Sequence, residues 1–93
     1  MLSKYELTLI LRTSLKEAEQ KKVFEEVKKN LGKEGKVKET KDLGKRMLSF
    51  RIKKEKEGNY FLLTLETLAD NIIKLSNNLR QKDEIIRFLI VRS

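Results

Sequence analysis

The sequence contains no cysteine, histidine, tryptophan or proline. Without cysteine, the chain can form neither a disulfide nor a zinc–thiolate or iron–sulfur site. Without histidine, it lacks the side chain that most often serves as a general base or a metal ligand, and it cannot build a Ser-His triad. These absences argue against an enzyme, and we expect neither a cofactor nor a metal ion.

Long hydrophobic runs are absent as well. The longest uninterrupted apolar stretches are residues 9–11 and 88–91, whereas a membrane-spanning helix needs about 20 apolar residues. Near the start, Glu6 and Thr8 interrupt the apolar pattern and no small-residue cleavage site follows, so the segment does not resemble a secretion signal. We therefore expect a cytoplasmic protein that does not bind a membrane.

Positive charge is what the sequence has in excess. The 93 residues, which we expect to form one domain (1–93), carry 22 basic and 14 acidic side chains, a net charge of +8. Residues 33–58 hold ten of the basic and five of the acidic side chains, and so +5 of that charge. Lysines on a solvated edge strand would explain this excess. A nucleic-acid partner would also explain it. Five of the arginines favour that partner, because arginine makes bidentate phosphate contacts: Arg46, Arg51, Arg80, Arg87 and Arg92.

Hydrophobic periodicity predicts six elements in the order βαββαβ. Strands are expected over residues 2–12, 36–53, 59–66 and 84–92, and helices over 14–31 and 67–80. Capping pairs are expected at the helix starts, Ser14 with Glu17 and Thr67 with Asp70. Gly44 interrupts the second strand and predicts a bulge, and the charged segment 53–58 predicts a turn.

This element order is typical of the ferredoxin-like α+β fold. It predicts a four-stranded antiparallel sheet with the spatial order 4-1-3-2 and both helices on one face. Strand alternation places six side chains on the other, open face: Ile10, Tyr60, Leu62, Thr64, Leu89 and Val91. An apolar surface of this kind usually marks an interface, and we expect Tyr60 and Leu62 to bind a protein partner.

Other proteins with this fold do not fit the sequence as well. The RNA-recognition motif stacks bases on aromatic side chains, but the stretch from Glu57 to Leu62 matches only the glycine of its pattern. Acylphosphatases cradle a phosphate in the loop after the first strand, but the loop Arg12-Thr13-Ser14 has no glycine. A small regulatory domain that binds a ligand as a homodimer remains as an alternative function.

The chain resembles the bacterial small-subunit ribosomal protein S-six family. The resemblance covers nearly the whole chain and lies in a set of short stretches in a fixed order: Tyr5-Glu6, Leu43-Gly44-Lys45-Arg46, Leu48 with Phe50 and Ile52, Gly58-Asn59-Tyr60-Phe61, Leu79-Arg80, and Arg87 through Val91-Arg92. No single stretch is diagnostic, but their combination with the right strand and helix lengths is specific.

The resemblance implies a structural role in the small ribosomal subunit, and therefore a ribosome-associated protein. It implies binding to the central domain of small-subunit ribosomal RNA, together with ribosomal protein S-eighteen as a heterodimer partner. By position it also implies RNA contacts from five basic residues: Arg46, Lys54, Arg80, Arg87 and Arg92. It implies no small-molecule substrate.

Overall fold

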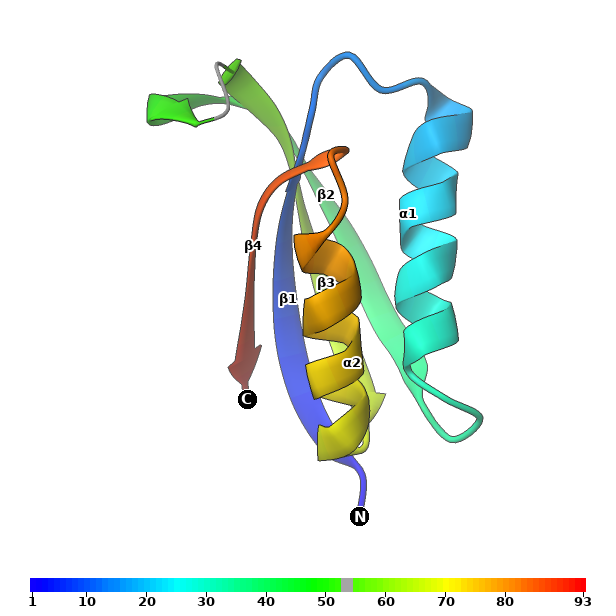
Figure 1. The fold of residues 1–93 in the computed structure, drawn as a ribbon. Coiled ribbons are helices and arrows are strands. Elements are labelled where there is room, and N and C mark those ends of the chain that lie inside the picture. The colour runs from blue at the N-terminus through cyan, green and yellow to red at the C-terminus, as the bar shows by residue number, and fades with distance from the viewer. Residues whose placement is uncertain (53–54) are drawn as a thin grey trace.

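The described part of the chain forms four strands and two helices in βαββαβ order (Figure 1). We used a computed structural model, which describes residues 1–52 and 55–93. The elements in chain order are β1 (Ser3–Leu11), α1 (Glu17–Asn30), β2 (Lys36–Ile52), β3 (Glu55–Thr67), α2 (Ala69–Arg80) and β4 (Ile85–Arg92).

The strands form one antiparallel sheet in the order β2-β3-β1-β4. This is the predicted order 4-1-3-2 counted from the other edge, so the ferredoxin-like fold is confirmed. Both helices pack on one face of the sheet, and the opposite face is uncovered (Figure 1). β1 and β3 are central, whereas β2 and β4 each have one edge without a neighbouring strand.

The core lies between the helices and one face of the two central strands. Every second side chain of β1 and β3 is buried there, and each helix contributes one apolar stripe: Tyr5, Leu7, Leu9, Leu11, Phe61, Leu63, Leu65, Val23, Val27, Leu75 and Leu79. Phe24 of α1 meets Phe61 of β3 edge to face, with ring centroids 5.0 Å apart. This alternation fixes which side chains remain for the open face, where Ile10 is buried as well.

α1 starts later than predicted, and the expected capping pair is wrong. The backbone N–H of Leu15 bonds to the carbonyl of Arg12, so Ser14 lies inside a turn and cannot cap the helix. Lys16 takes the N-cap position, and its backbone N–H donates to the carboxylate of Glu19 at 3.0 Å. The reciprocal glutamate of a capping box is therefore present two residues after the predicted one.

α2 likewise begins after its predicted start, because Thr67 has a different role. Thr67 is the buried last residue of β3, and its hydroxyl donates to the carbonyl of Leu31 at 2.7 Å. The side-chain amide of Asn71 donates to the same carbonyl and to the Thr67 hydroxyl oxygen, at 3.0 and 3.2 Å. These bonds join the end of α1 to the start of α2, and Leu68 becomes the N-cap.

The hairpin of β2 and β3 extends beyond the rest of the sheet. The last pair between β1 and β3 is Leu11 with Asn59, so residues 46–52 and 55–58 project past the end of β1; we call them the hairpin arm (Figure 1). Just before the arm, Gly44 has φ +83° and marks the predicted bulge. β3 begins at Glu55 rather than at the predicted residue 59, so part of the expected turn is strand.

Thr67→Val tests the bonds between the helices. Valine has nearly the same shape but leaves Leu31 with one donor fewer, so we expect a loss of about 1–2 kcal/mol in the free energy of unfolding. Urea denaturation measures it. Thr64→Val, at a half-buried position in the same strand on the open face, is the control and should change stability by less than about 0.5 kcal/mol. Equal losses in both variants would contradict the assignment.

Candidate nucleic-acid interface

The strand register arranges the open face of the sheet in rows that run across it. One row consists of Gly44, Tyr60, Ile10 and Arg87, taken from β2, β3, β1 and β4 in turn. The next row consists of Lys41, Leu62, Thr8 and Leu89, and a third of Glu39, Thr64, Glu6 and Val91. The pairing therefore confirms that the six side chains predicted for this face lie on it.

Charge is distributed unevenly along these rows. The row nearest the hairpin arm contains Arg87 and no carboxylate, whereas the third row contains Glu6 and Glu39. Lys41 in the middle row lies 3.8 Å from the Glu39 carboxylate, so part of its charge is balanced. The positive end of the open face is thus the end beside the arm.

Arg46, the first residue of the arm in β2, folds over this same end of the face. Its guanidinium carbon lies 5.7 Å from the centroid of the Tyr60 ring, and its Nε donates to the carbonyl of Leu43 at 3.4 Å. A guanidinium above an aromatic ring is held by the ring quadrupole, and its outer N–H groups stay available. Tyr60 therefore orients a cation at the base of the arm.

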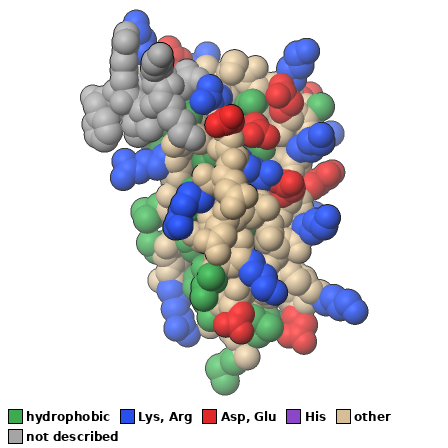
Figure 2. Space-filling model, viewed as in Figure 1, with side chains coloured by type: hydrophobic (Ala, Val, Ile, Leu, Met, Phe, Trp, Pro, Cys, Tyr) green, Lys and Arg blue, Asp and Glu red, His purple; other side chains and the backbone are tan. Residues whose placement is uncertain are grey.

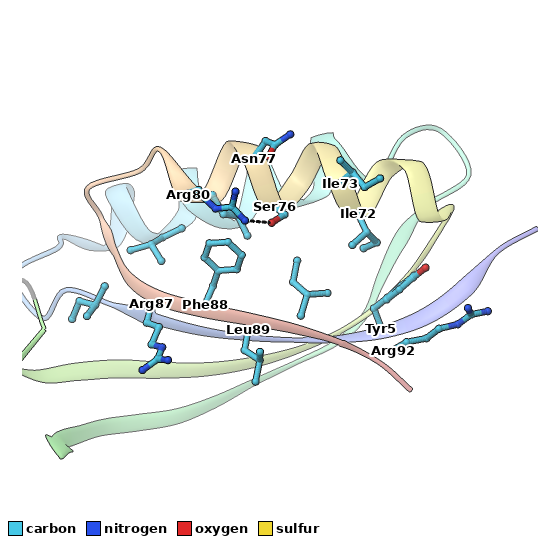
Figure 3. A pocket seen from close by; sticks show the side chains of 14 residues that line it. Tyr5, Ile72, Ile73, Ser76, Asn77, Arg80, Arg87, Phe88, Leu89 and Arg92 are labelled. Atoms are coloured by element: carbon cyan, nitrogen blue, oxygen red, sulfur yellow. Dashed lines mark hydrogen bonds between the residues drawn. The ribbon is translucent and has the colours of Figure 1, made fainter. Parts of the chain in front are cut away.

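Arg87 stands in the same row as Tyr60, two strands away across Ile10. Its side chain is exposed and points away from the helices (Figure 3). Together with Arg46 it makes a pair of exposed arginines on one face of the sheet. This arrangement suits an extended polyanion, because each guanidinium can take a separate phosphate.

Arg80 and Arg92, which were predicted to contact RNA together with Arg46 and Arg87, lie on the other side of the sheet. Arg80 is on α2, where its Nη2 donates to the Ser76 hydroxyl at 3.3 Å, and Arg92 is at the end of β4, donating to Ser3 at 3.1 Å (Figure 3). The five predicted RNA contacts therefore do not form one patch. Lys54, the fifth of them, lies outside the described residues.

These four arginines differ from most lysines of the second strand in having no acidic partner. Lys38 pairs with Glu66 and Lys45 with Glu57, at 3.8 and 3.7 Å. Over residues 1–52 and 55–93, no described carboxylate is within ion-pair distance of Arg46, Arg80, Arg87 or Arg92. Part of the excess charge in residues 33–58 is therefore neutralised within β2 and β3, whereas these four arginines keep their charge available for contacts outside the chain.

The face formed by the helices shows no such excess. α1 carries four lysines and four glutamates. Figure 2 shows basic and acidic side chains interleaved on the side of the molecule where α1 lies. Within the part of the chain that the structure describes, no group of three acidic residues could hold a metal ion, and no helix there is long and apolar enough to span a membrane.

Tyr60 and Leu62, predicted to bind a protein partner, are half-buried neighbours on the open face. Leu62 lies between Lys41 and Thr8, in the row that ends with the exposed Leu89. Periodicity placed both residues correctly on the face. It did not show that the Tyr60 ring is covered by Arg46, since the side chain of a long cation is not constrained by strand alternation.

Comparison with known proteins adds an independent line of argument. Residues 4–92 match the family described as Ribosomal protein S6. The chain is 31% identical over 91 residues to small ribosomal subunit protein bS6 of Alkaliphilus oremlandii, covering 98% of this chain and 97% of that protein. It is 39% identical over 89 residues to the same protein of Campylobacter jejuni subsp. jejuni, covering 95% of this chain and 71% of that one.

Comparison with a solved structure supports the same family as these sequence comparisons. The crystal structure of 30S ribosomal protein S6 from Thermotoga maritima superposes with a TM-score of 0.87 at 29% identity, over 100% of this chain and 89% of that one. The match therefore extends from the sequence to the complete βαββαβ arrangement. The chain therefore belongs to the ribosomal protein S6 family of the small ribosomal subunit.

Proposed function

We propose that this chain is a cytoplasmic, ribosome-associated structural component that binds the central domain of small-subunit ribosomal RNA together with ribosomal protein S-eighteen. Membership of the family supports the ribosomal role. The observation that carries the RNA contact is the pair of exposed arginines, Arg46 over Tyr60 and Arg87, in the row of the open face nearest the hairpin arm. The role requires no catalysis and no cofactor.

Phosphate contacts are the physical basis of the proposal. Folded RNA presents its phosphates at closely spaced positions, and a cation that neutralises one releases a condensed counterion. Arg46 is held by Tyr60 and the Leu43 carbonyl, so less side-chain freedom is lost when it binds. Such contacts position a protein on RNA without reading its bases, which suits a structural role.

The remaining predicted contacts keep the status of proposals. Arg80 and Arg92 can reach only RNA that approaches from the side of α2 and the end of β4, so their contacts require RNA on two sides of the molecule. Tyr60 and Leu62 remain the surface predicted from the sequence for S-eighteen. No observation on the described residues favours the alternative of a homodimeric regulatory domain.

We call the end of the open face that carries Arg46 and Arg87 the RNA face. Arg46→Ala and Arg87→Ala test it directly. Each should weaken binding to a central-domain RNA fragment at least about tenfold, because each removes a charge-assisted hydrogen bond worth roughly 1.5–3 kcal/mol. The slope of log affinity against log salt should also become shallower by roughly 0.7–0.9 per variant. Filter binding over a salt series, with S-eighteen present and absent, measures both quantities.

Lys28→Ala provides the matched control, since Lys28 is an exposed cation on α1, away from the open face. It should leave affinity and slope within error of the wild type. The RNA face would be refuted if Lys28→Ala cost as much as Arg46→Ala, or if affinity did not depend on salt.

Tyr60→Leu distinguishes the contribution of the Tyr60 ring from that of the Arg46 charge. The charge of Arg46 stays, so the salt slope should not change, but affinity should fall roughly two- to fivefold, as expected from about 0.5–1 kcal/mol for an exposed cation–π contact. The same filter-binding series measures it. A loss as large as that of Arg46→Ala would show instead that the ring contacts RNA itself.

A further inference from the structure

A groove runs between α2 and β4, on the opposite side of β4 from the RNA face. It has a volume of about 760 Å³. Its walls are mainly apolar, with Ile72 and Ile73 from the helix and Phe88 and Ile90 from the strand (Figure 3). Ile73 is 63% exposed, although it is a large hydrophobic side chain on a helix that is otherwise packed against the sheet.

The outer edge of β4 borders this groove and has unpaired backbone groups. At the end of the strand, the N–H of Ser93 donates to the carbonyl of Lys4 at 3.1 Å. In an antiparallel ladder the bonded pairs alternate with non-bonded pairs. The backbone groups of Leu89 and Val91 are therefore directed to β1, and those of Phe88, Ile90 and Arg92 are directed away from the sheet.

The same alternation sends side chains to opposite sides. Phe88 lies on the groove side of β4, and Leu89 points away from α2 (Figure 3). An extended peptide that paired with the outer edge of β4 would thus find free N–H and C=O groups at Phe88 and Ile90. Every second side chain of that peptide would enter the groove and meet Ile73. This is how strand addition combines backbone bonds with side-chain pockets.

The charge of the groove selects among possible occupants. On the groove side its lining includes two arginines, Arg80 of α2 and Arg92 of β4, and no aspartate or glutamate. A second copy of this chain, added edge to edge, would bring its own arginines to the same place, and like charges oppose that pairing. An RNA strand would gain little from the apolar walls, because Phe88 packs against the core and is only partly exposed for stacking.

We infer that the groove and the outer edge of β4 form a docking site for an extended segment of a protein partner, added as a fifth strand. The segment has apolar side chains at alternating positions and acidic side chains near its ends, which face Arg80 and Arg92. The inference rests on the proposed function in one respect, namely that the partner is S-eighteen. It differs from the prediction that Tyr60 and Leu62 hold that partner.

Two matched variants decide between the groove and the open face. Ile73→Glu places a carboxylate in the groove, and Leu89→Glu places one on the opposite side of β4; the native side chains are 63% and 61% exposed. Neither substitution removes a buried group, and unfolding temperatures verify that both variants fold. Calorimetric titration of each variant with purified S-eighteen should show Ile73→Glu binding at least tenfold more weakly than the wild type and Leu89→Glu within twofold.

Hydrogen exchange supplies a second readout. In the complex, the amides of Phe88 and Ile90 should exchange at least tenfold more slowly than in the free chain, because the added strand accepts their hydrogen bonds. The already bonded amides of Leu89 and Val91 should change much less. This pattern distinguishes strand addition from a contact made by side chains alone.

The outcomes separate this inference from the proposed function. If the wild type binds S-eighteen and Leu89→Glu or Leu62→Glu abolishes binding while Ile73→Glu does not, the groove is wrong and the open face is right. Unchanged exchange at Phe88 and Ile90 would also overturn strand addition. If the wild type does not bind S-eighteen at all, the proposed heterodimer is wrong as well. If Ile73→Glu weakens RNA binding but not S-eighteen binding, the groove is an RNA site and the inference fails.

Discussion

The pairing of β1 with β3 on one edge and β4 on the other determines the rest of this structure. A slip of one residue in either ladder would turn Leu7 and Leu9 to solvent and bury Glu6 and Thr8. The free energy of burying the apolar side chains therefore holds the register, and the register in turn places Tyr60 and Arg87 in one row. The site on the open face is a consequence of the core on the other.

Sequence periodicity was sufficient to predict the sheet, but it did not predict the residues at which the helices begin. Alternation in β1 and β3 predicted the faces correctly, because burial repeats every second residue, and the βαββαβ element order predicted the strand order. The capping pairs failed for two reasons: Ser14 lies inside a turn closed by the bond from Leu15 to Arg12, and Thr67 has a distant partner that no local pattern encodes. Thr67 bonds to Leu31, 36 residues earlier, and a hydroxyl engaged at that distance is not available to its own helix.

The candidate sites were predictable in part. The excess charge in residues 33–58 was visible, but the stacking of Arg46 on Tyr60 was not, since it depends on how a long side chain folds over a neighbouring strand. Arg80 on α2 and Arg92 at the end of β4 lie on the other side of the sheet from Arg87, which residue type alone does not indicate. One sequence signal for the groove existed: Ile73 lies beside the buried stripe of α2 and not within it.

β4 closes the sheet by pairing with β1, and its Arg92 bonds to Ser3 across 89 residues of sequence. Contacts between such distant segments form late, because the loop-closure entropy must be lost before they contribute. During synthesis β1 emerges first and must wait for β4, the last element in chain order. The groove has no second wall until that strand is in place. A partner that binds in the groove therefore cannot bind an incomplete or partly folded chain. Its binding is thus a sign that folding is complete.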